Sequence, residues 1–391
     1  MLFLSAIRQS GENPKMGGAT SSILQKIYII IHLFNVLPIS IMQSRSLFLS
    51  LFFVGILISC RAQKPVTELK LASGAKLMLL DSASAAQAIV TDATDGFFEK
   101  VTPVEMSIQL KKPLAAGTDR AALLVEYTDF LKKDVAGFTP EESRWVADIW
   151  KEVGKTVGKF NKNLLPAEVH LIKTKGRHYG DGVYYTRENC IIIPQNELDA
   201  RNRTEFLATM YHELFHVISR LDHARRDELY GLIGFKPIGR ALNLPEELKN
   251  KMFFNPDGVD YAQVIHLKSA QDQDVMAVPV IFSNTAGGFT AKKSSFFSYL
   301  DFALFQVKQR PDGSWHLVTN PDGSSTIDLK QFHDTFFGQI GDNTQYIIHP
   351  DEVLADNFSF LMAMENDGAV KNKFSKDGQK LLEKIRAVLV K

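Results

Sequence analysis

The apolar residues of this chain recur at two different spacings, and each spacing predicts a different kind of element. In residues 139–160 they return every three or four positions, which is typical of a helix that buries one face. Thr139, Pro140 and Glu142 stand in the order of a helix cap, a first-turn proline and a capping-box glutamate, so we expect this helix to begin at Thr139. A helix before it is expected to begin at Thr118.

A third amphipathic helix is expected to begin near Asn202, where Asn202-x-x-Glu205 resembles a capping box. Its apolar positions repeat at helical spacing and leave the opposite side polar. These positions are Leu207, Met210, Leu214, Ile218 and Leu221. Two further helices are expected to close the chain, at about 350–365 and 377–390.

Short apolar runs bounded by glycine and proline predict strands. Such runs occur in 68–80, 168–173, 182–186, 189–194, 275–282 and 296–307. The Pro-Asp-Gly sequences at 256–258, 311–313 and 321–323 are interpreted as turns, because none has the full ligand spacing of a calcium loop. Helices and strands together predict an α+β fold.

The first 59 residues are expected to be a targeting segment. Neither of their apolar runs reaches the ~18 residues that a spanning helix needs. The second run follows Arg45 and ends in Leu57-Ile58-Ser59-Cys60, which resembles the lipobox of a bacterial lipoprotein signal. The resemblance implies a lipidated Cys60 on the bacterial cell envelope and a short tether over 60–67. Met42 is then a better translation start than Met1. The alternative is that one or both apolar runs form an uncleaved membrane anchor.

Composition and charge narrow the function further. The chain has 45 Lys+Arg against 44 Asp+Glu, a net charge of +1, and no basic stripe, so we exclude a nucleic-acid partner. Its 2 cysteines cannot form a disulfide framework. Cys190 lies in the apolar run Cys-Ile-Ile-Ile-Pro and is expected to be a small buried strand residue, not a reactive thiol.

Candidate chemistry lies in the helix after Asn202, which contains His212-Glu213-Leu214-Phe215-His216. Histidines four positions apart fall on one helical face, so two imidazoles can reach one tetrahedral zinc ion. The glutamate between them is placed to take a proton from a water that the metal activates. The alternative is that the two histidines lie on the protein surface with a solvated glutamate and bind no metal.

A catalytic zinc ion needs a third protein ligand, and two patterns are available. A metzincin-type ligand would be Asp222, but Ser219 stands where the turn requires glycine. The other pattern is a later glutamate with an aspartate four residues on, which orients a ligand histidine. Among the downstream glutamates tested, Glu352 has this partner, Asp356, although an acidic first helical turn would look the same.

Together these motifs resemble the gluzincin metallopeptidases, the thermolysin-like branch of the zincins. The resemblance implies a zincin-like core, a mixed sheet with an active-site helix, in which His212, His216 and Glu352 hold Zn²⁺. It further implies Glu213 as general base and proton donor and Asp356 as the partner of one histidine. A strand just before the motif helix, either 182–186 or 189–193, would be the sheet edge that pairs with an extended peptide.

The interval between His216 and Glu352 is longer than compact members of that family have. We therefore expect a β-rich insertion at 251–335, between a core at 161–250 and a C-terminal region at 336–391 with the third-ligand helix. Residues 68–160 would form an N-terminal α/β region.

A donor that stabilises the developing oxyanion is also expected. Tyr346 and His349, just before the ligand helix, are the first candidates, with His178 and Tyr179 behind them. The sequence thus predicts an envelope-anchored zinc peptidase that acts on a peptide or protein substrate. Two alternatives stay open: a non-catalytic envelope lipoprotein with a structural zinc, and a zinc hydrolase of a non-peptide amide, such as one in the cell wall.

Overall fold

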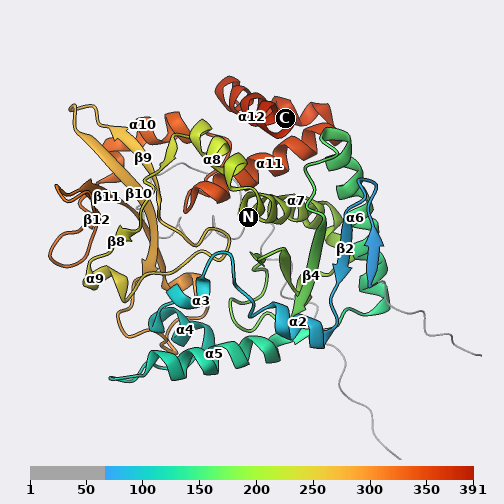
Figure 1. The fold of residues 1–391 in the computed structure, drawn as a ribbon, viewed down its shortest axis with the longest axis horizontal. Helices are drawn as coiled ribbons and strands as arrows, with labels where there is room; N and C mark the ends of the chain where they lie inside the picture. Colours follow the sequence, from blue (N-terminus) through green and yellow to red (C-terminus); the bar gives the residue numbers. More distant parts are fainter. Residues whose placement is uncertain (1–66) are drawn as a thin grey trace, which may run out of the picture. The chain divides into compact units, whose positions relative to one another are not determined.

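The computed structural model describes residues 67–391. The expected signal segment, Met42 and Cys60 lie outside the described residues. Within the described part, helices combine with two mixed β-sheets, which confirms the α+β class (Figure 1). No helix in this part of the chain is both long and apolar enough to cross a lipid bilayer.

The first sheet holds the strands that precede the histidine helix. Its order is β1-β2-β4-β6-β5, with β3 beside β4. Strands β2, β4 and β6 are parallel, whereas β1 and β5 pair antiparallel at the two edges. The bounds are β1 Glu68–Lys70, β2 Lys76–Leu79, β3 Val135–Ala136, β4 Glu168–Thr174, β5 Tyr185–Arg187 and β6 Cys190–Pro194.

The central strands β4 and β6 are mostly buried on both faces, which explains their almost continuous apolar runs. Leu171 and Ile191 belong to the core shared with helices α6 (Pro140–Phe160) and α7 (Arg203–Leu221). Ile172, Ile192 and Cys190 face a second cluster that includes residues of α2 (Ser82–Ala88) and α5 (Arg120–Asp134). Cys190 is 2% exposed and is the buried strand residue that the sequence predicts.

The three predicted helix starts differ in outcome. The Thr139 capping box of α6 is present: the Glu142 amide donates to Thr139 Oγ1 at 3.2 Å, and the Thr139 amide donates to Glu142 Oε2 at 2.7 Å. Helix α5 is capped by Asp119 instead of Thr118. Asn202 precedes α7 as expected, but its side chain makes no capping hydrogen bond, so the capping box predicted there is wrong.

The second sheet has the order β7-β9-β10-β11-β12-β8, with every pair antiparallel except the short parallel pair β12 and β8. The Pro311-Asp312-Gly313 turn joins β11 to β12. Strands β7 and β8 precede residue 251, so this sheet extends beyond the expected insertion. The bounds are β7 Phe235–Pro237, β8 Leu242–Asn243, β9 Gln263–Lys268, β10 Asp274–Ser283, β11 Leu300–Gln309 and β12 Trp315–Val318.

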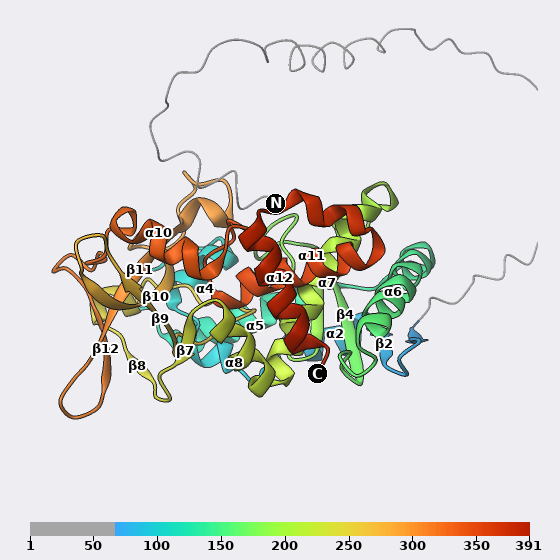
Figure 2. The ribbon, with the colours of Figure 1, turned by 90° about the horizontal axis from the view of Figure 1, so that it is seen from above.

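Helix α11 (Pro350–Asn366) packs along α7 in the views of Figures 1 and 2. The Phe215 and Phe358 rings meet between these helices, with centroids 5.7 Å apart. The buried core around them reaches both sheets, which fixes α7 and α11 firmly against each other. The other helices are α3 Phe97–Lys100, α4 Pro103–Leu110, α8 His223–Leu232, α9 Glu246–Lys249, α10 Leu329–Ile340 and α12 Lys376–Leu389.

Candidate metal centre

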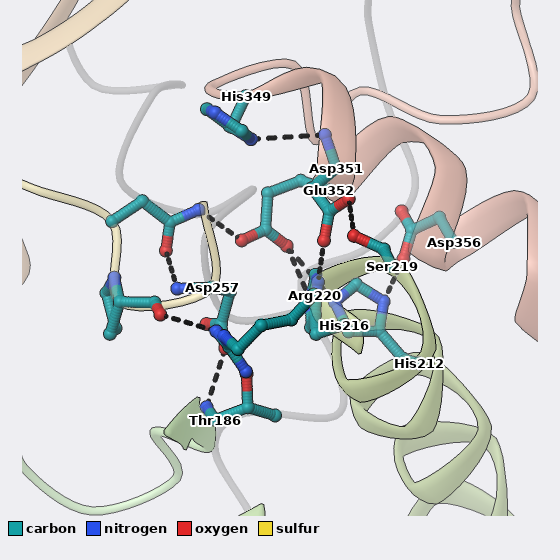
Figure 3. A network of polar contacts seen from close by, with 12 residues as sticks. Thr186, His212, His216, Ser219, Arg220, Asp257, His349, Asp351, Glu352 and Asp356 are labelled. Carbon is teal, nitrogen blue, oxygen red and sulfur yellow. Dashed lines mark hydrogen bonds and ion pairs between the residues drawn. The ribbon is translucent and has the colours of Figure 1, made fainter. Parts of the chain in front are cut away.

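The packing of α7 against α11 brings His212, His216 and Glu352 together (Figure 3). Glu352 Oε2 lies 3.1 Å from His212 Nε2 and 3.5 Å from His216 Nε2. The two imidazole centroids are 4.8 Å apart. His216 and Glu352 are each only 1% exposed, so this meeting point is inside the protein.

This geometry fits a metal ion. Ligand atoms about 2.0–2.2 Å from a tetrahedral zinc ion lie roughly 3.3–3.6 Å from one another, close to the separations of Glu352 Oε2 from the two Nε2 atoms. His216 Nε2 is buried and has no hydrogen-bond partner. A buried polar atom without a partner is costly, and a metal ion would satisfy it. Nitrogen and carboxylate donors are those that zinc prefers.

A carboxylate holds the far nitrogen of each histidine. Asp356 Oδ1 lies 2.9 Å from His212 Nδ1, as the sequence predicts, and its other oxygen accepts from Thr344 Oγ1. Asp351 Oδ2 lies 2.7 Å from His216 Nδ1, a partner that the sequence analysis missed. Such contacts fix the imidazole tautomer so that Nε2 faces the metal.

The second carboxylate oxygen of Asp351 is also hydrogen-bonded. This oxygen, Oδ1, accepts hydrogen bonds from Ser219 Oγ at 2.6 Å and from Tyr230 Oη at 2.8 Å. The side chain is 0% exposed. An acidic residue directly before Glu352 was a signal in the sequence, but it resembled an ordinary acidic first helical turn.

The site carries a strong excess of negative charge. The carboxylates near the two histidines are Glu213, Asp257, Asp351, Glu352 and Asp356. Burial acts to lower the pKa of His212, but the hydrogen bonds to Asp356 and Glu352 outweigh it and raise that pKa to about 10. Burial also opposes protonation of His216, yet the nearby Asp257 and Glu352 raise its pKa well above the usual range. Without a metal ion the centre therefore draws in protons, which a bound cation would replace.

Glu213 lies beside His212 and His216, and one of its carboxylate oxygens has no hydrogen-bond partner. Its side chain is 4% exposed, and Oε2 is buried with no partner. Burial, and after it the charge of Asp257, raises the pKa of Glu213 to about 8. A carboxylate with such a pKa can accept and return a proton near neutral pH.

Asp257 is a further carboxylate that the sequence analysis did not assign to the site. One of its oxygens, His216 Nε2 or Nδ1 and a Glu352 oxygen all lie within 4.8 Å of one another. Burial raises the pKa of Asp257. It belongs to a Pro-Asp-Gly sequence, which we interpreted as a turn; the local sequence holds no signal that separates it from the other Pro-Asp-Gly turns.

The two candidate oxyanion donors have different surroundings. The Tyr346 ring stacks near His212, with centroids 6.0 Å apart and planes 20° from parallel. His349 instead caps α11: the Asp351 amide donates to its Nδ1 at 3.1 Å, and its Nε2 lies 3.4 Å from the carbonyl oxygen of Asp260. Figure 3 shows His349 apart from His212 and His216. His349 is therefore the cap of α11, and Tyr346 is the candidate whose ring lies next to His212.

His178 and Tyr179 belong to a separate buried network. His178 Nδ1 lies 2.6 Å from Asp134 Oδ2, and its Nε2 lies 3.0 Å from Tyr185 Oη. The Tyr179 hydroxyl donates to Glu105 Oε1 at 3.4 Å. These hydrogen bonds go to Asp134, Tyr185 and Glu105, not to His212, His216 or Glu352.

Strand β5 is the edge of the first sheet next to α7. Its residues are buried, with Thr186 0% exposed. The Thr186 amide donates to Asp257 Oδ1 at 2.6 Å, away from the partner strand β6. The edge that the resemblance assigns to an extended peptide is thus covered by Asp257 at this position.

Comparison with known proteins adds no relative: no family model, no curated protein and no solved structure matches this chain.

Proposed function

We propose that this chain is a zinc-dependent hydrolase of the gluzincin type that cleaves peptide bonds. The observation that carries the proposal is the meeting of His212 Nε2, His216 Nε2 and Glu352 Oε2, with Glu213 beside them. A structural zinc site needs no carboxylate next to its ligands, whereas hydrolysis needs a proton acceptor there. The proposed fold is a zincin-like core in which α7 lies against a mixed sheet that ends in β5.

A bound zinc ion would supply an activated water and polarise the carbonyl of the scissile bond. In our proposal Glu213 takes the proton from the water and later gives it to the leaving amine. The burial that raises its pKa to about 8 suits both steps. The Tyr346 hydroxyl stays protonated, because burial and the surrounding carboxylates hold its pKa well above the usual range, and it would donate to the carbonyl oxygen.

The proposed place of this activity is the bacterial cell envelope, with the chain held on the membrane through a lipidated Cys60. Support comes from the sequence Leu57-Ile58-Ser59-Cys60 after an apolar run. The proposed substrates are peptides or proteins that reach this surface.

Elemental analysis of the full-length chain tests the metal centre. We expect about one zinc ion per chain, bound by the Glu213→Gln variant and lost by Glu352→Ala. Digestion of an unfolded protein, followed by mass spectrometry, should show cleavage by the wild type and none by Glu213→Gln. The exposed Glu205→Gln on the same helix is the matched control and should behave as the wild type. A folded wild type that binds no zinc would overturn the proposal.

One observation favours a second candidate, a non-catalytic envelope module with a structural zinc. Asp257 lies within reach of His216 and Glu352, and a fourth protein ligand is the mark of a closed structural site. On that alternative the wild type and Glu213→Gln would both bind zinc, and neither would cleave peptides.

A further inference from the structure

Residues 255–258 form a turn, the 255–258 turn, that brings the carboxylate of Asp257 close to His216 and Glu352. His216 belongs to two possible ligand groups, one with His212 and Glu213 and one with Asp257 and Glu352, each within 4.8 Å. His216 Nε2 and Glu213 Oε2 are buried and lack hydrogen-bond partners. Asp257 therefore lies within reach of two of the three proposed ligands, His216 and Glu352.

The 255–258 turn is held in place by α11 and α7. Asn255 Nδ2 donates at 2.6 Å to Glu352 Oε1, the oxygen that is not the proposed ligand atom. Arg220 Nη2, one turn after His216 on α7, donates to the Pro256 carbonyl oxygen at 2.8 Å. These bonds come from residues of the site itself, so the position of Asp257 depends on the metal-binding helices.

Asp257 also occupies the sheet edge. Both the amide and the hydroxyl of Thr186 donate to Asp257 Oδ1, each at 2.6 Å (Figure 3). An extended peptide that added to β5 would need the same outward amide. The Asp257 side chain therefore accepts from the outward amide of β5 and also lies beside two of the proposed metal ligands.

We propose that Asp257 is a fourth protein ligand of the metal, which closes the centre until a substrate displaces it. This inference rests on the zinc centre proposed above. A peptide that pairs with β5 competes with Asp257 for the Thr186 amide, so binding at the edge also frees the fourth metal position for water. In this proposal the substrate itself displaces Asp257 from the metal. Short ligands that cannot pair with β5 do not displace Asp257 and so do not reach the metal.

The 255–258 turn lies outside the strands of both sheets, and its Gly258 packs closely against His349. Between α9 and β9 the described chain contains isolated bridges, at Met252 and between Asn255 and Gly258, but no helix or strand. A movement of Asp257 away from the centre would break the bonds that join the turn to Glu352, Arg220 and Thr186, and none of these bonds pairs β9 with β10 or β5 with β6.

The test uses Asp257→Asn in the full-length protein. The amide oxygen of asparagine still accepts from Thr186, but the neutral side chain is a poor zinc ligand. Asp312→Asn is the matched control, because Asp312 holds the same place in the exposed turn Pro311-Asp312-Gly313. The readouts are zinc affinity by chelator competition, the visible absorption of the cobalt(II)-loaded protein, and the binding of acetohydroxamate to the metal.

We expect Asp257→Asn to bind zinc roughly 10–100-fold more weakly, to change the cobalt absorption and to bind acetohydroxamate at least about tenfold more tightly than the wild type. Asp312→Asn should match the wild type in all three. Asp257→Ala, checked by thermal unfolding, serves if the asparagine variant does not fold. In the wild type, acetohydroxamate should leave the cobalt absorption unchanged.

Identical zinc affinity, cobalt absorption and acetohydroxamate binding in Asp257→Asn and the wild type would overturn this inference. If the wild type then still binds zinc through Glu352, the proposed function stands and only the role of Asp257 falls. If the wild type binds no zinc, both fall. A wild-type cobalt spectrum that responds to acetohydroxamate would also count against a closed centre.

Discussion

Asp351 Oδ2 lies 2.7 Å from His216 Nδ1, so the residue directly before the ligand Glu352 orients the histidine that Glu352 itself approaches. One helical turn of α11 thus supplies both a proposed metal ligand and the partner of another proposed ligand. Asp356, one turn further along α11, makes the corresponding contact with Nδ1 of His212. Each histidine therefore has its own carboxylate on α11.

Asp351→Asn should weaken zinc binding roughly 10–100-fold, because the amide keeps a hydrogen-bond acceptor but loses the charge that favours the correct tautomer. Asp356→Asn should have an effect of similar size. Chelator competition measures both. Asp334→Asn is the control, since Asp334 lies 3.0 Å from His333 Nδ1 in an exposed pair far from any ligand. Unchanged zinc affinity in both variants would show that these carboxylates do not tune the metal.

Gly258→Ala should destabilise the protein by about 1–3 kcal/mol, the usual cost of overpacking. A methyl group there would lie 2.1 Å from Cε1 of His349, the cap of α11. Denaturant unfolding of the metal-free protein measures the change. Gly287→Ala, where nothing lies within 4 Å, should leave the free energy of unfolding nearly unchanged. Equal stability of the two variants would contradict the tight contact between Gly258 and His349.

Glu105 should make stability depend on pH. Burial raises its pKa from 4.5 to about 8 in the folded protein, although it accepts a hydrogen bond from the Phe254 amide at 3.1 Å. The folded state thus holds this proton longer than the unfolded state. The contribution is fully present below pH 4.5 and is lost as the pH rises towards 8.

Glu105→Gln should flatten this dependence, so the difference in free energy of unfolding between the variant and the wild type should change across that window. Urea unfolding at a series of pH values gives this difference. The exposed Glu247→Gln should run parallel to the wild type throughout. Parallel curves for Glu105→Gln would mean that Glu105 does not stay protonated in the fold.

Cys190 should be almost inert in the folded protein. Burial raises the pKa of its thiol from 9.0 to about 12. A shift of this size lowers the thiolate fraction near neutral pH by about a thousandfold, and the thiolate is the reactive form. In a Cys60→Ser background, reaction with an aromatic disulfide reagent should be fast in denaturant and at least a thousandfold slower without it. Similar rates in both conditions would contradict the buried position.

The sequence predicted a structural feature correctly where all the interacting residues lie within a few positions of one another. The capping box at Thr139 works because all its atoms lie within one helical turn. The approach of Asp356 to a histidine was also predictable, since its spacing from Glu352 places both on one helical face.

The missed residues depend on contacts across the chain. Asp257 shares its Pro-Asp-Gly sequence with the exposed turn of Asp312, and only the tertiary fold sets the two apart. His349 was favoured by its nearness to Glu352 in the sequence, yet the extended backbone at that residue makes it the cap of α11. The polar side expected for the histidine helix is buried against α11, because the charged partners of His216 lie there.

The spacing of the ligands along the chain has a consequence for folding. His212 and Glu352 are 140 positions apart, and the second sheet forms from the residues between them. Closing so long a loop costs entropy before any contact repays it, so we expect the centre to form late in folding. Metal uptake during refolding should therefore follow the slowest folding phase. Zinc would then bind the folded protein and would not nucleate folding.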